Sequence, residues 1–139
     1  MVIDLSSDFG KRVQSRLQSE QIIWLVTTSA DGTPQPSPVW FLYSNESVLM
    51  YSEPNTPKVR NIARNPHVAL HFDSDGNGGN IVVLTGTARV LTEAPLHDEE
   101  TAYVTKYAEG IKGIGLSPES MFAKYSAVIR ITPEKVRGF

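Results

Sequence analysis

Six short segments rich in β-branched and aromatic residues, separated by turn residues, restrict this chain to a mainly β fold. The segments are residues 21–28, 34–43, 48–52, 67–72, 80–91 and 126–132. Turns join most neighbours, and Asp31-Gly32 is a strong signal for a β-hairpin. The 139 residues suffice for a single domain over residues 1–139. The pattern predicts a small closed or split β-barrel of about six mainly antiparallel strands.

Helical signals lie between some of these strands, so the predicted fold is mostly β (α+β) with peripheral helices. Phe9, Val13 and Leu17 recur at helical spacing, which predicts an amphipathic helix near the start of the chain. Further helices are expected over residues 57–65, 95–109 and 117–125.

Three alternating prolines distinguish one of the predicted strands. Pro34, Pro36 and Pro38 fill the first half of the segment that follows the Asp31-Gly32 turn. Proline has no backbone N–H, so these residues remove three hydrogen-bond donors. We therefore expect this half of the strand to lie at a sheet edge or to stay unpaired.

The composition excludes several classes of protein. The net charge of -2 and a pI near 5.9 argue against a nucleic-acid-binding protein. The absence of cysteine excludes disulfides, thiolate nucleophiles and cysteine-ligated metals. No apolar run approaches the length of a membrane span, and charges interrupt the N-terminal segment too often for a secretory signal. We expect a cytoplasmic protein that binds neither nucleic acid nor membranes.

Motifs for metal binding, hydrolysis and dinucleotide binding are incomplete. The loop DSDGNGG begins like a calcium loop, but Leu84 stands where a bidentate acid is required. His67 and His71 share a strand and His97 stands alone, so we expect no metal site. The sequence has no G-x-S-x-G elbow, and the GIKGIG run follows a helix instead of a strand.

The predicted helix after residue 56 has a start that could bind an anion. Thr56 is a good N-cap and Pro57 a good first helical residue. Lys58 lies in the first turn, where it opposes the helix dipole unless an anion such as phosphate is bound. Ser52 adds a hydroxyl group. The alternative is a solvated Lys58 beside a Thr56 that only caps the helix.

Three segments in order resemble the pyridoxamine 5′-phosphate oxidase-like family of split β-barrels, which bind flavin or deazaflavin. They are WLVTTSADGTPQPSPVWF, YSEPNTPKVRNIARNPHVALHF and IVVLTGTARV. The chain is most similar to the branch of reductases that depend on the deazaflavin coenzyme F-420, whose members end like IRITPEKVRGF. The resemblance spans nearly the whole chain and implies the FMN-binding split-barrel type of fold.

The resemblance implies which residues hold the cofactor phosphate. Tyr51 and Ser52 match the family's aromatic-hydroxyl pair at a strand end, Thr56 its loop hydroxyl and Lys58 its phosphate-binding lysine. Pro57 stands where the oxidases often have an arginine.

Other residues are implied along the cofactor ring and tail. Ser37, Pro38, Val39 and Trp40 match the strand whose backbone runs along the ring. The oxidases' arginine early in this strand is absent, which argues against oxidation of pyridoxamine phosphate itself. Arg60 and Arg64 follow on the polar face of the same short helix. They could bind the acidic tail of F-420, which FMN lacks, or could simply be solvated.

The leading functional prediction is an F-420-dependent oxidoreductase that transfers hydride to a small organic molecule. The alternatives are an FMN-binding reductase or oxidase of the same family, and a non-catalytic carrier of a flavin-like or tetrapyrrole cofactor. No catalytic acid or base stands out, because in such enzymes the cofactor carries the chemistry. The resemblance also implies a homodimer with cofactor sites at the subunit interface, where Lys106, Tyr107 and Arg137 could contribute.

Overall fold

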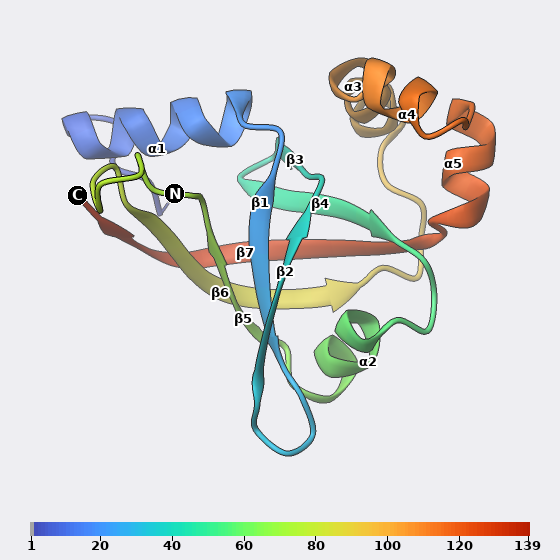
Figure 1. Ribbon diagram of the computed structural model, residues 1–139, viewed down its shortest axis with the longest axis horizontal. Helices are drawn as coiled ribbons and strands as arrows, with labels where there is room; N and C mark the ends of the chain where they lie inside the picture. Colours follow the sequence, from blue (N-terminus) through green and yellow to red (C-terminus); the bar gives the residue numbers. More distant parts are fainter. Residues whose placement is uncertain (1) are drawn as a thin grey trace.

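The computed structural model describes residues 2–139, which form one seven-stranded antiparallel sheet. The strands are β1 (Ile23–Thr28), β2 (Pro34–Val39), β3 (Leu42–Ser44), β4 (Ser47–Ser52), β5 (His67–His71), β6 (Val82–Val90) and β7 (Ala127–Gly138). Their order across the sheet is β2-β1-β5-β6-β7-β4-β3. The sheet curls into a half-barrel (Figure 1), which confirms the predicted split β-barrel.

The strand count differs from the prediction because the segment of residues 34–43 forms two strands. Trp40 and Phe41 separate β2 from β3, which lie at opposite edges of the sheet. The Phe41 side chain is fully buried in the core. If β2 had continued as one strand, Phe41 would have stayed at the edge of the sheet. Burial of this aromatic ring therefore turns the chain from one edge of the sheet to the other.

The last strand is longer than predicted. β7 continues beyond residue 132 and pairs with β6 as far as Gly138. The register shifts between Thr85 and Gly86, where β7 skips Glu134 next to Pro133, which has no N–H to give to the ladder. A Cβ atom on Gly86 would lie 2.1 Å from the carbonyl oxygen of Thr132, so only glycine permits this close approach.

The proline-rich strand β2 forms one edge of the sheet, as expected. It pairs with β1 along all six residues, from Ile23 opposite Val39 to Thr28 opposite Pro34. The three prolines alternate, so their nitrogen atoms share one side of the strand. The hydrogen-bonded ladder between β2 and β1 is continuous, so the proline nitrogen atoms do not face β1. They lie on the opposite side of β2, at the open edge of the sheet. The prolines thus remove donors from the free edge and leave carbonyl oxygens there.

Five helices accompany the sheet within residues 2–139. They are α1 (Asp8–Ser19), α2 (Pro57–Arg64), α3 (His97–Lys106), α4 (Ala108–Gly113) and α5 (Pro118–Lys124). The predicted helix over residues 95–109 is in fact two helices that meet at Tyr107. α3, α4 and α5 gather at one corner of the molecule, and α2 lies apart from them (Figure 1). Across the described part of the chain, no helix combines the length and apolar character that a membrane crossing requires.

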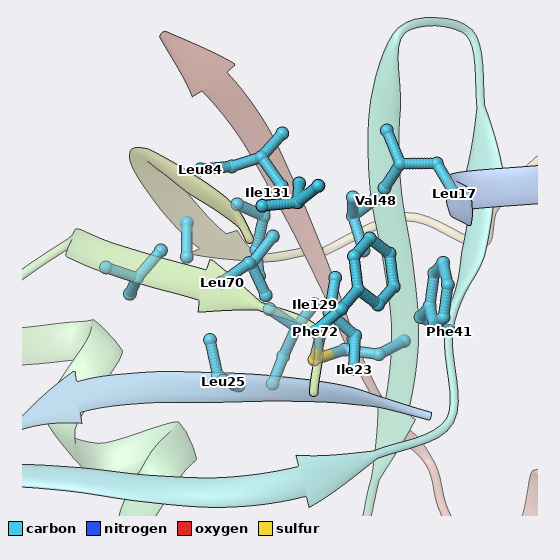
Figure 2. Close-up of a cluster of buried hydrophobic side chains, with 14 of the residues drawn as sticks. Leu17, Ile23, Leu25, Phe41, Val48, Leu70, Phe72, Leu84, Ile129 and Ile131 are labelled. Carbon is cyan, nitrogen blue, oxygen red and sulfur yellow. The ribbon is translucent and has the colours of Figure 1, made fainter. Parts of the chain in front are cut away.

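The main core fills the concave side of the sheet. Ten of its side chains are labelled in Figure 2: Leu17, Ile23, Leu25, Phe41, Val48, Leu70, Phe72, Leu84, Ile129 and Ile131. α1 contributes Val13 and Leu17, both fully buried, which confirms the predicted amphipathic helix. α2 contributes Ile62 to the same core.

A second core lies between α3–α5 and the strands β3 and β4, and we call it the aromatic cluster. Its buried residues are Tyr103, Tyr107, Ile111 and Met121, with Trp40, Leu42, Tyr51, Leu116, Phe122 and Tyr125 packed around them. Helical periodicity alone gave no sign of this cluster, because its residues come from five separate elements and loops.

A buried ion pair fastens α3 to the sheet. Arg130 on β7 donates from Nη2 to Glu99 Oε1 at 2.7 Å and from Nη1 to Glu99 Oε2 at 3.1 Å. Ser47 accepts a further bond from Arg130 at 2.7 Å. The hydrogen bond from Arg130 lowers the pKa of Glu99 below its usual value. The pair holds the aromatic cluster against β4 and β7.

Candidate functional site

The start of α2 leaves backbone donors open. Thr56 occupies the N-cap position, as predicted, but its side chain makes no capping hydrogen bond. Its Oγ1 instead lies 3.2 Å from Ser52 Oγ at the end of β4. Pro57 has no N–H, and the first intrahelical bond runs from Arg60 N to Thr56 O. The N–H groups of the first turn therefore face outward uncapped, at the positive end of the helix dipole.

These donors border a groove between α2 and the edge strand β2, which we call the Lys58 groove. It measures about 450 Å³ and is lined by Thr27, Pro34, Gln35, Pro36, Ser37, Pro57 and Lys58. Lys58 is half-buried there instead of extending freely into solvent. The groove brings together Ser37, Pro57 and Lys58, which the sequence placed in two separate segments.

Asn61 sets the width of the Lys58 groove. Its side chain is buried and donates to Thr27 Oγ1 at 3.0 Å and to Gln35 Oε1 at 2.7 Å. These bonds join α2 to β1 and β2. Sequence reasoning missed Asn61, because a single asparagine on a helix has no motif around it.

The two arginines of α2 are exposed but held by neighbours. Arg60 donates from Nη1 to the carbonyl oxygen of Asn55. Arg64 donates from Nη2 to Asn61 Oδ1 at 2.9 Å. Neither arginine lines the Lys58 groove, and both lie on the solvent side of the helix that borders it.

A second hollow continues along β2 beyond the Lys58 groove, and we call it the aromatic pocket. It measures about 290 Å³ and is lined by Pro38, Val39, Trp40, Tyr51, Tyr103, Ile114, Met121 and Tyr125. No charged side chain lines it. Ile114 is half exposed, at 51%, and lies in the connection between α4 and α5. The pocket therefore offers flat, apolar walls.

Trp40 forms a rigid wall of the aromatic pocket. Its ring stacks on Tyr107 with 4.6 Å between centroids and an angle of 4° between planes. On α4, a Cβ atom at Gly110 would lie only 2.9 Å from the Trp40 ring. Glycine at this position therefore lets α4 approach the indole closely.

Lys106 and Tyr107 both hold the chain where β2 turns toward β3. Tyr107 Oη accepts from Phe41 N at 2.8 Å and donates to the Gln21 carbonyl oxygen at 2.7 Å. Lys106 Nζ donates to the Phe41 carbonyl oxygen at 2.8 Å and lies 3.7 Å from the Phe41 ring centroid. Burial lowers the pKa of Lys106 to about 8 and raises that of Tyr107 to about 12. Within a single chain, the side chains of Lys106 and Tyr107 therefore hold the backbone of Phe41 in place.

Tyr51 and Ser52 point to opposite faces of β4, as neighbours in a strand do. Ser52 is buried beside Thr56, at the start of α2. Tyr51 packs in the aromatic cluster against Tyr103 at 4.6 Å, and its hydroxyl is buried without a partner in the described chain. Burial raises the pKa of Tyr51 well above its usual value. The structure thus divides this pair between the two hollows.

Nine of the eleven cofactor residues suggested by the sequence gather at the Lys58 groove and the aromatic pocket. Ser37, Pro57 and Lys58 line the groove, Ser52 and Thr56 border its helix start, and Pro38, Val39, Trp40 and Tyr51 line the pocket. Arg60 and Arg64 lie just outside. Arg137 is exposed on β7 opposite Val83 and lines neither hollow.

The sequence profile of the pyridoxamine 5′-phosphate oxidase family matches residues 9–139. The chain belongs to this family. No curated protein matches the chain.

Solved structures with the same fold bear names that point to several cofactors. An F420 reductase is 24% identical, with a TM-score of 0.64, and the match covers 89% of this chain and 94% of that one. The heme storage protein HutZ from Vibrio cholerae is 17% identical, with a TM-score of 0.70 and 92% of each chain covered. A FAD-binding protein from Mesorhizobium loti is 20% identical, with a TM-score of 0.66, covering 91% and 88%. At these identities the likeness establishes the shared fold alone.

Proposed function

We propose that this family member is an F-420-dependent oxidoreductase that transfers hydride to a small organic molecule. The observation that carries the proposal is the order of the two hollows along the edge of β2. The Lys58 groove begins at an uncapped helix start, and the aromatic pocket follows at Pro38 and Trp40. A ligand with a phosphate at one end and a flat ring at the other matches this order.

The start of α2 suits a phosphate. The uncapped N–H groups of the first turn and the ammonium of Lys58 all favour a negative charge at the same place. The Ser52 and Thr56 hydroxyls lie 3.2 Å apart beside them. Ser52 donates to the Glu53 carbonyl oxygen at 2.9 Å, so the Thr56 hydroxyl is the one that can turn to donate to an anion. An anion would also relieve the repulsion between Lys58 and the helix dipole.

The open edge of β2 suits the ring. Its outward carbonyl oxygens accept hydrogen bonds, and the prolines leave no competing N–H at these positions. A flavin or deazaflavin ring carries an N–H on its pyrimidine side that can donate to such an oxygen. Trp40 then supplies a flat apolar wall. When bound, the coenzyme supplies hydride transfer, and the chain supplies position and exclusion of water.

F-420 is favoured over FMN because of the cations beyond the phosphate. Arg60 and Arg64 lie on the solvent face of α2, where the glutamyl tail of F-420 would leave the groove. FMN ends at its phosphate and would leave both arginines without a ligand. FMN remains the second candidate, because the groove itself suits either phosphate.

A titration with both cofactors tests the proposal. We expect F-420 to bind more tightly than FMN, with an advantage that shrinks as salt screens the carboxylate tail. Oxidation of reduced F-420 by a panel of small unsaturated acceptors then tests for catalysis. Tight binding without turnover would support a cofactor carrier, whereas a protein that binds FMN and ignores F-420 would overturn the cofactor assignment.

We also propose that two copies form a homodimer through the convex face of the sheet. Trp24, Val26 and Ala69 on this face are only half-buried, and a hollow of about 530 Å³ crosses β1, β5, β6 and β7 there. A two-fold partner is the commonest cover for such a face. Sedimentation at micromolar concentration should give twice the chain mass of 15.3 kDa. Ala69→Arg should give a monomer, and a monomeric wild-type protein would contradict the dimer.

A further inference from the structure

A further hollow lies beside the aromatic pocket, and we call it the Glu100 pocket. It measures about 290 Å³ and is lined by residues 91–95, which lead from β6 to α3, and by Tyr51, Glu100, Phe122, Tyr125, Ser126 and Val128. It shares Tyr51 and Tyr125 with the aromatic pocket. Its lining differs from that pocket in one important respect, because it includes carboxylates.

Three aromatic rings line the Glu100 pocket. Tyr51 and Phe122 lie 4.9 Å apart between centroids. Tyr125 already attracts a cation, since Lys124 Nζ lies 5.6 Å from its ring centroid. Aromatic faces attract ammonium groups through the ring quadrupole, and quaternary ammonium ligands are commonly held in such surroundings.

Glu100 supplies a half-buried negative charge that no cation in the described chain neutralises. Its neighbour Glu99 is paired with Arg130 at 2.7 Å. The other lining carboxylate, Glu93, lies 3.7 Å from Arg89, and both side chains are more than 60% exposed. Glu100 has no cationic partner within 4.0 Å among residues 2–139. A half-buried carboxylate beside aromatic rings is therefore left to attract a cation from outside.

Tyr51 presents its ring to this pocket, whereas its hydroxyl lies beneath the surface. It is buried and has no hydrogen-bond partner within residues 2–139. Burial, followed by the charge of Glu100, raises the pKa of Tyr51, so its hydroxyl stays protonated. Tyr51 therefore adds a neutral aromatic wall and no negative charge to the pocket.

We propose that the Glu100 pocket binds a small organic ammonium ion of the choline type. Glu100 provides the counter-charge, and Tyr51, Phe122 and Tyr125 provide the walls. The site is separate from the Lys58 groove, but it shares the walls Tyr51 and Tyr125 with the aromatic pocket.

Glu100 also lies in the first turn of α3, where an acid stabilises the helix dipole. Asp98 lies in the same turn, is exposed and does not line the pocket. Asp98→Asn therefore makes the same change of charge in the same helix without touching the pocket, which makes it a matched control for Glu100→Gln.

The test is a calorimetric titration with choline and with its neutral isostere 3,3-dimethylbutan-1-ol. We expect saturable choline binding that Glu100→Gln weakens about tenfold and Asp98→Asn leaves unchanged, with the neutral isostere bound at least about tenfold more weakly. If Glu100→Gln fails to fold, Tyr125→Leu should weaken choline binding by a similar factor. Equal binding of the isostere, equal binding by Glu100→Gln, or no saturation with choline overturns the proposal.

Discussion

The two ends of the β2 edge are built in different ways. At the Lys58 groove, the groups that suit an anion come from one short stretch, residues 52–58, which ends in the first turn of α2, and β1 and β2 line the opposite side. At the aromatic pocket, they come from β2, β4, α3, α5 and the connection after α4. A local motif therefore sets the first end, whereas long-range packing sets the second. Mutations far from the ligand should damage the aromatic end and spare the groove.

The largest expected effect comes from breaking the ion pair that fastens α3. Glu99→Ala leaves Arg130 without its partner and should lower the free energy of unfolding by about 3–5 kcal/mol. Asp98→Ala, an exposed neighbour, should change it by less than about 0.5 kcal/mol. Urea unfolding measures both. Equal effects would contradict the buried pair.

The same pair gives a dependence on acid. The folded-state pKa of Glu99 is lowered, so its contribution is present above the unfolded value of about 4.3. That contribution is lost as pH falls through the folded value. As the pH falls below about 4.3, the free energy of unfolding of the wild type should therefore decrease more steeply than that of Glu99→Ala.

An intermediate effect should follow from crowding Trp40. Gly110→Ala places a Cβ atom 2.9 Å from the indole and should cost about 1–3 kcal/mol of stability. Gly113→Ala in the same helix meets nothing within 4 Å and should be neutral or stabilising. Thermal unfolding and Trp fluorescence check both. A Gly110→Ala protein with normal stability and fluorescence would show that the cluster is looser than described.

The smallest effect concerns Lys106. Its folded-state pKa is lowered to about 8 by burial, so the unfolded chain holds the proton more tightly. Stability from this group should therefore rise between about pH 8 and the unfolded value near 10.4, by about 1 kcal/mol for a partly exposed ammonium. Lys106→Met should lack this rise, whereas exposed Lys112→Met should keep it. Parallel stability curves for the wild type and Lys106→Met would contradict the lowered pKa.

The features of the fold that depend on local sequence signals were predicted from the sequence. β-branched runs, the Asp31-Gly32 turn and the Thr-Pro helix start gave the strands, the edge position of β2 and the start of α2. It did not predict Asn61 or the pair of Glu99 and Arg130, because each depends on partners at least 26 residues away. Family resemblance implied only the side of the aromatic pocket formed by residues 38–40, and it placed Tyr51 at the phosphate instead. The helical side was not predicted, because no local periodicity links Trp40 to the helices around it.

The central claim is that the Lys58 groove holds the phosphate of the cofactor. Isothermal titration of F-420 and FMN into the wild type, Lys58→Ala and Lys11→Ala tests it most directly. Lys11 is an exposed lysine in the early part of α1, far from the groove, and serves as the matched control. A charge-assisted contact is worth about 1.5–3 kcal/mol, so Lys58→Ala should bind roughly 10- to 150-fold more weakly. Lys11→Ala should bind as the wild type does. An unchanged dissociation constant in Lys58→Ala, or a wild type that binds neither cofactor, would contradict the claim.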